Sequence, residues 1–459
     1  MPDAGNRSTE EAVLLLQHAS DPSSIGASAL RKAAWRLLPV ISIGYLLAYM
    51  DRINISFASL RMNIDLHFSA TVYGFGAGLF FIGYAVCEVP SNLMLLRFGP
   101  RRWLARIMLT WGLLAAGMMF VRTPLQFYVM RLLLGIAEAG FFPGIIYYLT
   151  LWFPASMRAR AVSRFYIALP LSSVVMGSLA GWLLGLQGKL GLAGWQWLFL
   201  VEGLPAALFS FVILRMLPDG PAHASWLTPE EKNWLKQQLD SDAEHAHLGH
   251  SAGILQALLS PKVWTIGLFF FCMLTCSYAF NFSAPAILQG VTGWSVDRVG
   301  YLVAGFGIAG ALAMLLVSAS SDRKGERALH CIVPSLATGV GFLVAGCGRP
   351  AWLVIVALAI SFSAYNALLG PALAVPTQFL AGRAAAAGIA AMNTITMFSG
   401  FLGPYWMGVM KDATGSYWLG LRGLIIPSLG AAAAMFMLTR SLARHIPAAS
   451  TAGLADKPA

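Results

Sequence analysis

Two adjacent charged residues, Asp51 and Arg52, lie inside the apolar segment from Gly44 to Ser56. Their side chains suit two kinds of chemistry: a carboxyl group binds or releases a proton, and a guanidinium binds an anion. A charge near the centre of a membrane span costs roughly 2.5 to 3.5 kcal/mol on insertion scales, so charged residues there have a partner or a task. We therefore place the centre of the candidate site at Asp51 and Arg52.

A second charged pair, Arg131 and Glu138, lies in the apolar stretch 125–152. The spacing of this pair places both side chains on one face of a helix, about two turns apart. If Glu138 lies within reach of Arg52, an anion that occupies Arg52 removes the counter-ion of Glu138 or Asp51 and changes the proton affinity of that carboxyl. The spacing therefore predicts a link between anion binding and protonation.

The elements that must position these residues are membrane-spanning helices. The chain has 459 residues, of which 58% are hydrophobic and only 11% are charged, outside the range of soluble globular proteins. Windows of about 20 apolar residues indicate a span each. They predict an all-α membrane protein with twelve helices near 35–58, 72–96, 102–121, 125–152, 160–186, 195–217, 262–284, 298–319, 330–347, 351–379, 384–410 and 416–440.

The net charge of +11 does not indicate nucleic-acid binding, because the cations cluster in alternate loops between the spans. By the positive-inside rule, such loops lie in the cytoplasm, and both termini with them. The clusters are Arg31, Lys32 and Arg36; Arg97, Arg101, Arg102 and Arg106; Arg158, Arg160 and Arg164; Arg323, Lys324 and Arg327; and Arg440 and Arg444. We expect a multi-pass membrane protein with both termini in the cytoplasm.

The long polar loop 218–261 divides the spans into two halves, expected as six-helix bundles over 31–217 and 262–444. Thr228, followed by Pro and two acids, has the pattern of a helix start within this loop. Residues 1–30 lack the order of a secretory signal and are expected to form a disordered cytoplasmic tail. Residues 445–459 are expected to form a second cytoplasmic tail. His245, His247 and His250 in the loop have no thiolate or carboxylate to complete a recognisable metal site, so we expect none.

The motifs of soluble enzymes are missing from the sequence. We find no Gly-rich phosphate loop, no GxSxG and no HExxH, and the five cysteines form no CxxC. None of the eight histidines lies deep in a predicted span. We therefore expect no enzymatic activity and no cofactor other than a proton as coupling ion.

The ionisable residues inside the spans are unevenly distributed. Nearly all lie in the first half, while the second half offers neutral polar residues. This pattern indicates one ion-handling wall and one shape-selecting wall. For Arg131, Glu88 and Glu202 we also keep the alternative of a buried network that only joins helices. The neutral residues are Asn281, Gln289, Asn366, Thr377 and Asn393.

An ordered series of segments covers nearly all of the spans. The segments are Tyr49-Met-Asp51-Arg52-Ile-Asn54, Phe80-Phe-Ile-Gly83-Tyr84, Val89-Pro90-Ser91-Asn92, Arg97-Phe-Gly99-Pro-Arg101-Arg102, Gly135-Ile-Ala-Glu138-Ala-Gly-Phe-Phe-Pro143-Gly144, Ser321-Asp322-Arg323-Lys324-Gly325-Glu326-Arg327 and Gly382-Arg383-Ala384. The series resembles the major facilitator superfamily, and more narrowly its anion:cation symporter branch of bacterial sugar-acid, tartrate and aromatic-acid transporters. This resemblance implies a location in the bacterial inner membrane.

The resemblance implies a role for each residue of the site. In the family, the Arg after the first-span Asp binds a substrate carboxylate, and that Asp and the span 4 Glu carry protons; these positions are Arg52, Asp51 and Glu138. The implied substrate-binding residues are Arg52, Tyr49, Tyr84, Asn393, Asn281 and Ser283. Gating is implied for the repeated basic loops 97–102 and 322–327 and for span 4, through Arg97, Arg101, Arg131, Asp322, Arg323 and Arg327.

Three positions depart from the family pattern. Ser283 stands where an aromatic residue is expected, and Ala372 and Leu373 replace bulkier residues. These changes predict a wider, less aromatic wall in the second half, unless Tyr278 or Tyr365 refills the space.

The expected function is import of an organic acid anion (a sugar acid, hydroxy-dicarboxylate or aromatic acid) by proton symport. The alternatives are export or exchange of amphipathic compounds on the same fold, and a non-transporting sensor, which would need an appended signalling domain. The expected partners are the small anion, the proton and the lipid bilayer. A monomer suffices, because twelve spans form a complete pathway.

Overall fold

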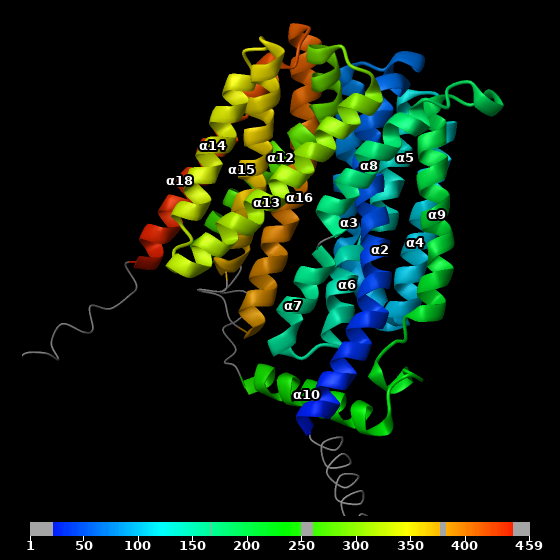
Figure 1. The fold of residues 1–459 in the computed structure, drawn as a ribbon, viewed down its shortest axis with the longest axis vertical. Coiled ribbons are helices and arrows are strands. Elements are labelled where there is room, and N and C mark those ends of the chain that lie inside the picture. Colours follow the sequence, from blue (N-terminus) through cyan, green and yellow to red (C-terminus); the bar gives the residue numbers. More distant parts are fainter. Residues whose placement is uncertain (1–21, 167, 249–259, 377–381, 444–459) are drawn as a thin grey trace, which may run out of the picture.

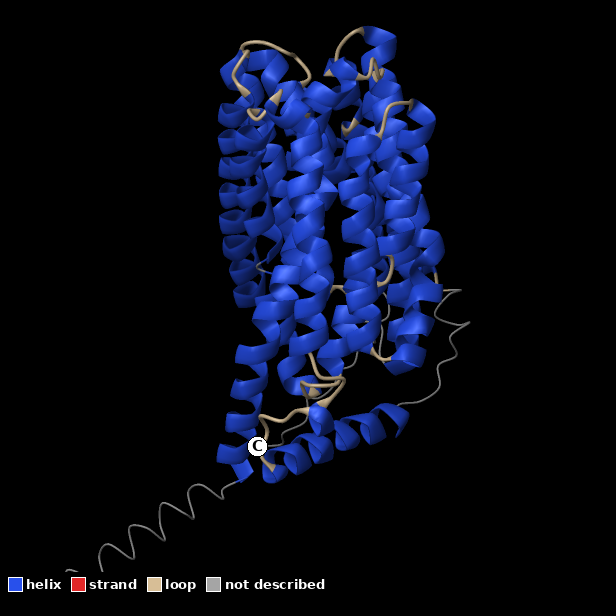
Figure 2. Ribbon diagram, turned by 90° about the vertical axis from the view of Figure 1, so that its right-hand side faces the viewer, coloured by secondary structure: helices blue, strands red, loops and turns tan. Residues whose placement is uncertain are grey.

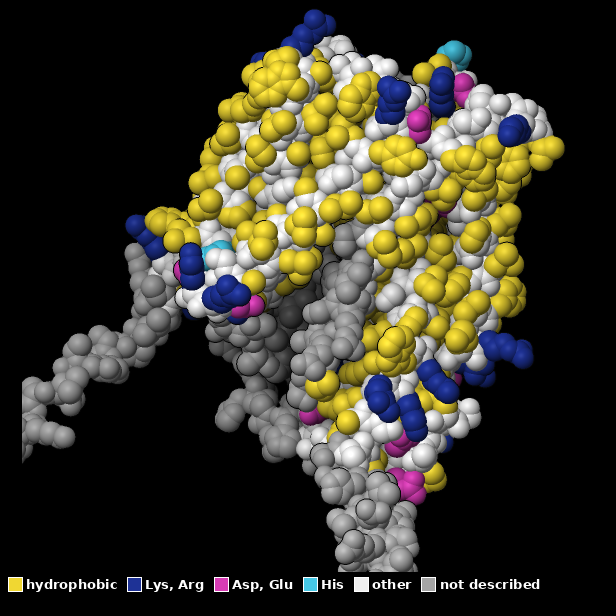
Figure 3. All heavy atoms as spheres, in the orientation of Figure 1, with side chains coloured by type: hydrophobic (Ala, Val, Ile, Leu, Met, Phe, Trp, Pro, Cys, Tyr) yellow, Lys and Arg dark blue, Asp and Glu magenta, His cyan; other side chains and the backbone are white. Residues whose placement is uncertain are grey.

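The structure is a computed structural model that describes residues 22–166, 168–248, 260–376 and 382–443. Every regular element in these ranges is a helix, and most helices stand side by side along one direction (Figures 1 and 2). Hydrophobic side chains cover the flank seen in Figure 3, and Lys and Arg gather toward its two ends. This distribution is that of a protein whose flank faces lipid.

The first group of helices, called the N-bundle, contains the six spans expected before residue 218. The fourth span is broken after Glu138, where Gly140 adopts a φ of +86°, a conformation that glycine tolerates. The elements are α2 (Pro22–Asp65), α3 (Ala70–Phe98), α4 (Pro100–Gly117), η1 (Met118–Phe120), α5 (Pro124–Glu138), α6 (Phe141–Thr150), α7 (Ala155–Tyr166), α8 (Ala168–Leu184), η2 (Lys189–Gly191) and α9 (Gly194–Met216).

The second group, called the C-bundle, contains the remaining spans. Its helices are α12 (Pro261–Thr292), α13 (Val296–Lys324), α14 (Leu329–Ala345), α15 (Ala351–Ala374), α16 (Gly382–Thr414), α17 (Trp418–Gly423) and α18 (Ile425–Ala443). Within the described ranges, nine helical stretches are long and apolar enough to cross a membrane. The shorter apolar helices Leu171–Leu184 and Leu329–Ala345, together with α16, account for the other expected spans, so the all-helical prediction is confirmed.

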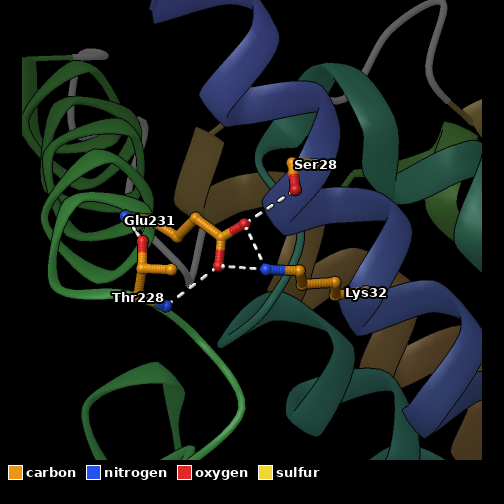
Figure 4. Close-up of polar contacts among 4 residues, drawn as sticks. All are labelled: Ser28, Lys32, Thr228 and Glu231. Atoms are coloured by element: carbon orange, nitrogen blue, oxygen red, sulfur yellow. Dashed lines mark hydrogen bonds and ion pairs between the residues drawn. The ribbon is translucent and has the colours of Figure 1, made fainter. Parts of the chain in front are cut away.

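Between the bundles, η3 (Pro221–His223) leads into α10 (Pro229–Leu248), which crosses the end of the molecule where α2 begins (Figure 1). The predicted helix start at Thr228 is confirmed. The Glu231 N–H donates to Thr228 Oγ1 at 3.3 Å, and the Thr228 N–H donates to Glu231 Oε2 at 3.0 Å. Glu231 also accepts hydrogen bonds from Ser28 Oγ and Lys32 Nζ, each at 2.8 Å (Figure 4). These bonds fasten α10 to α2.

The prediction of a disordered tail is wrong for residues 22–30, because α2 already begins at Pro22. The helix extends there because α10 covers it: Ala29 is fully buried, and Gly26 packs against the ring of Trp234. No hydropathy window detects this extension, since its partner is a polar helix of the central loop. The tails 1–21 and 445–459, loop residues 249–259, Thr377 and the three loop histidines lie outside the residues or side chains that the structure describes.

The bundles meet most closely in the half of the molecule opposite α10, called the far end. Gly74 of α3 lies against the backbone of Pro404 in α16, and Gly177 of α8 lies against Gly300 of α13, with no room for a Cβ at either glycine. At the edge of this contact, Asp412 of α16 accepts hydrogen bonds from the backbone N–H groups of Ala70 and Thr71, at 3.1 and 2.7 Å. A carboxylate at a helix N-terminus is stabilised by the helix dipole. The far end is therefore closed.

Candidate functional site

A cavity of about 360 Å³ lies between the two bundles, within the range of small-molecule sites. Both bundles contribute side chains, and the cavity extends from Arg52 toward the α10 end, past Phe270, Leu373 and Pro376. Aromatic rings and amides dominate its wall. The lining residues include Tyr45, Tyr49, Arg52, Tyr84, Phe142, Ser173, Tyr278, Asn281, Phe362, Tyr365, Asn366, Asn393 and Thr396.

Arg52 is the one charged residue among those that line the cavity in the described part of the chain. Its Nη2 donates to Oε1 of Glu138, and the two form an ion pair. The Arg52 side chain is 12% exposed and the Glu138 side chain 1%, so the guanidinium faces the cavity and the carboxylate lies behind it. The rings of Tyr49 and Tyr84 lie 5.9 and 5.5 Å from the guanidinium carbon. These contacts hold the cation at the wall, with one face toward the cavity.

The Arg52–Glu138 pair uses only part of its hydrogen-bonding capacity. Glu138 Oε2 and Arg52 Nε are buried and have no hydrogen-bond partner within the described residues. A guanidinium can bind a carboxylate through two parallel hydrogen bonds, and here it makes one. The guanidinium therefore has hydrogen-bonding capacity left for a second carboxylate.

Asp51 faces away from the cavity, although it precedes Arg52 in the chain. Successive residues of a helix are about 100° apart, so the two side chains point to different neighbours. Asp51 is 3% exposed and accepts hydrogen bonds from Trp111 Nε1 at 2.8 Å and from Asn54 Nδ2 at 3.1 Å. Asn54 Nδ2 also donates to Glu202 Oε2 of α9 at 2.6 Å. Asp51 thus belongs to a buried polar network behind the cavity.

Arg131 lies inside the N-bundle and is also fully buried. Its Nη2 donates to the carbonyl of Ala77 at 3.3 Å, and its guanidinium carbon lies 5.0 Å from the Phe80 ring. Glu138 is buried at the end of the same helix, α5. The common face predicted from their spacing is therefore present, although Arg131 forms no ion pair within 4.0 Å with a described residue.

On the C-bundle side, the cavity contains the predicted Asn281 and Asn393, together with Tyr278 and Tyr365. Asn393 Nδ2 donates to Glu88 Oε1 of α3 at 2.7 Å, which joins the two bundles one turn beyond Tyr84. Sequence reasoning did not place Glu88 in this contact, since no spacing rule relates residues of different bundles.

Ser283 is the predicted substrate-binding residue that the structure places elsewhere. It is 3% exposed and does not line the cavity. Because Asn281 faces the cavity, a residue two positions further along α12 lies about 200° around the helix. The tyrosines at 278 and 365 occupy the wall instead, so the aromatic character missing at Ser283 is restored nearby.

Apart from the buried Arg131, the predicted gating residues lie at or beside the ends of helices on the α10 side. Arg101 donates from its backbone N–H to Asp219 Oδ1 at 3.1 Å and from Nε to the Leu214 carbonyl at 2.5 Å. Arg97 lies over the ring of Phe98. Arg327 and Asp322 form an ion pair at 3.6 Å across the α13–α14 loop, beside the exposed Arg323. The Arg101 contact with Leu214 joins α4 to α9 within the N-bundle, while the contacts of Arg97 and Arg327 stay within α3 and at the end of α13.

Comparison with known proteins identifies the family. The sequence profile of the Major Facilitator Superfamily matches residues 41–404. A protein of Agrobacterium vitis named "Putative tartrate transporter" is 42% identical over 431 residues, which cover 93% of this chain and 94% of that protein. A protein of Acinetobacter baumannii named "Quinolone resistance transporter" is 38% identical over 402 residues, 87% of this chain and 92% of that protein.

A solved structure shares the fold. It is a bacterial homologue of the human lysosomal transporter Spinster, in an inward-facing and unoccupied conformation. The TM-score is 0.75 at 18% identity, over 90% of this chain and 98% of that chain. The family match, the similar relatives and the two-bundle architecture together show that this chain belongs to the Major Facilitator Superfamily and is a multi-pass membrane transporter, not an enzyme.

Proposed function

We propose that the protein imports an organic acid anion, such as a sugar acid, a hydroxy-dicarboxylate or an aromatic acid, by proton symport through alternating access. The observation that carries this proposal is the Arg52–Glu138 pair. It presents a guanidinium to the cavity and keeps a titratable carboxyl directly behind it. A cavity with a positive charge on its wall favours an anionic substrate.

The pair supplies a physical route from anion binding to protonation. A substrate carboxylate that binds the free side of Arg52 draws the guanidinium away from Glu138. The buried Glu138 then lacks its counter-ion, and taking up a proton removes the cost of an unpaired charge. Release of the anion reverses the exchange. The planar guanidinium of Arg suits this competition better than the ammonium of Lys, since it can donate two hydrogen bonds to either carboxylate in the same geometry.

Proton coupling also removes the energetic cost of moving an anion against the membrane potential. An anion that enters a cell against a negative-inside potential costs about 2.3 kcal/mol per charge and 100 mV. One proton carried by Glu138 cancels the charge of a monoanion, and a second titratable group would serve a dianion.

Alternating access requires that one end open while the other closes. In this structure the glycine contacts and Asp412 close the far end, and the cavity lining continues toward α10. We place the α10 end in the cytoplasm, with both termini, because the clustered cations of the chain lie in the loops of that side. The protein then faces inward in a bacterial inner membrane. One chain holds the whole cavity, so we propose a monomer as the working unit.

Export or exchange of amphipathic compounds is a second candidate. Two observations favour it: the cavity wall is rich in aromatic rings, and a relative at 38% identity carries the name "Quinolone resistance transporter". The two functions differ in the direction of the proton gradient that drives accumulation.

The test is uptake by proteoliposomes under an inward proton gradient. The panel contains labelled tartrate, galactonate, phthalate, hydroxyphenylacetate and a fluoroquinolone. We expect one acid to accumulate with the wild type and with Arg61→Ala, which removes an exposed Arg of α2 outside the cavity. Arg52→Ala should abolish this accumulation. If no acid moves and the quinolone instead accumulates in the vesicles when the gradient is reversed, the import proposal is wrong and export replaces it.

A further inference from the structure

Glu202 of α9 is a buried acid that the mechanism above does not use. It is 5% exposed, and no described cation lies within ion-pair distance of its carboxyl group. Its Oε2 accepts one hydrogen bond from Asn54, and its Oε1 is buried without a partner. An ionised carboxylate in such a place is strongly destabilised, because no described cation compensates for the lost hydration.

The hydrogen-bond inventory around Asn54 shows where a proton fits. Asn54 Nδ2 has two N–H groups, one for Asp51 Oδ1 and one for Glu202 Oε2. Asn54 Oδ1, like Glu202 Oε1, is buried and has no donor. If both acids are ionised, the network holds two unsatisfied acceptors. One proton on Glu202 turns an acceptor into a donor beside the Asn54 amide, as in the two-bond pairing of a carboxylic acid with an amide.

Asp51 differs from Glu202 in having groups that stabilise its ionised form. Trp111 Nε1 donates to it from α4, and Arg131 of α5 is near enough to interact with its charge. The groups that face Glu202 are Asn54 and Asp51 of α2, while α4 packs against α9 through the backbone of Gly112 and Ala116. Within the pair, the proton therefore belongs on Glu202 and the charge on Asp51.

We propose that Glu202 is a proton-binding site of the transport cycle, linked to Asp51 through Asn54. This inference rests on the proposed proton symport and adds a second proton store to Glu138. Two carboxyls that share one amide titrate as a unit. Arg131 interacts with both Asp51 and Glu138, so a change of charge on Glu138 reaches the pair. Protonation of Glu138 removes one of the two carboxylate charges that interact with Arg131, so Arg131 stabilises the charge on Asp51 more strongly and the proton stays on Glu202.

The first experiment measures proton-to-substrate flux ratios in proteoliposomes, with the acid that the wild type accumulates. Glu202→Gln should keep substrate counterflow but lower the steady accumulation about tenfold across a gradient of one pH unit, the factor expected for one lost proton. Glu202→Asp keeps a titratable group and should retain the wild-type ratio. Asp65→Asn is the control, because Asp65 accepts a hydrogen bond from Trp195 and so joins α2 to α9, as Glu202 does through Asn54, but lies at the far end of α2.

The second readout is the infrared difference spectrum of the purified protein on substrate binding. We expect a protonated-carboxyl band that Glu202→Gln removes and Glu202→Asp shifts. A wild-type flux ratio together with an unchanged spectrum in Glu202→Gln would overturn the inference and make Glu202 a structural residue. If the wild type shows no gradient-driven accumulation, the symport proposal fails. If the wild type accumulates substrate and Glu202→Gln reaches the same accumulation, this inference alone fails.

Discussion

The two walls of the cavity differ in charge. The N-bundle supplies Arg52, backed by Glu138 and by the Asp51 network, whereas the C-bundle supplies amides and tyrosines such as Asn393 and Tyr365. The difference shows that a change of charge on substrate binding can be completed inside one bundle. The neutral wall is then free to move against the charged one without breaking a buried ion pair, which would cost several kcal/mol. In the proposed mechanism, the N-bundle couples anion binding to protonation and the C-bundle selects the substrate.

The sharpest way to break this comparison is to neutralise the coupling acid. Glu138→Gln cannot release a proton, so we expect gradient-driven accumulation to be lost completely while counterflow of substrate persists. Parallel assays of accumulation and counterflow in the same proteoliposomes measure this. Glu138→Asp keeps an acid and should retain part of the accumulation. If Glu138→Gln accumulates substrate like the wild type, the charged wall does not couple through this residue.

The neutral wall should respond differently. Asn281 of α12 lines the cavity and donates through Nδ2 to the Ser277 carbonyl at 2.9 Å, which orients its amide. Asn281→Ala should raise KM about fivefold, the value of one lost hydrogen bond of about 1 kcal/mol. The proton-to-substrate ratio should not change. Flux assays over a series of substrate concentrations test both statements. A changed ratio would show that the neutral wall takes part in coupling.

A smaller effect is expected where the two bundles meet at the far end. Asp412→Asn replaces a charged acceptor of the Ala70 and Thr71 N–H groups with a neutral one. For a partly exposed contact, we expect the open population at this end to rise about threefold. Distances between spin labels at the exposed Arg122 and Trp294, one on each bundle, measure this population. An unaltered distance distribution would mean that glycine packing alone closes the far end.

The sequence predicted the spans and the common helix face of Arg131 and Glu138, because both depend on local rules. Hydropathy locates a span, and the spacing of Arg131 and Glu138 defines a common helix face. It did not predict which way each helix turns. Asp51 faces Trp111 and Ser283 is buried away from the cavity, because rotation about a helix axis is decided by packing against helices distant in sequence.

The smallest expected effect is on the stability of α10, which joins the two bundles in the chain but is hydrogen-bonded to α2 of the N-bundle. Burial raises the pKa of Glu231, but hydrogen bonds from Lys32, the Thr228 N–H and Ser28 outweigh it and hold the pKa below the usual range. A lowered folded-state pKa gives stability that is present above the unfolded value, about 4.3, and is lost as pH falls through the folded value.

Glu231→Gln should therefore lower the Tm in detergent near neutral pH. The loss in free energy of unfolding should stay within about 1 kcal/mol, because Lys32 is 38% exposed. Asp240→Asn, an exposed site on the same helix, is the control and should match the wild type. The difference in Tm between Glu231→Gln and the wild type should shrink as the pH falls below about 4. A difference that stays constant down to that pH would mean that packing on Ala29 and Trp234, rather than the ion pair, holds α10 against the N-bundle, and that the charge of Glu231 contributes nothing to this contact.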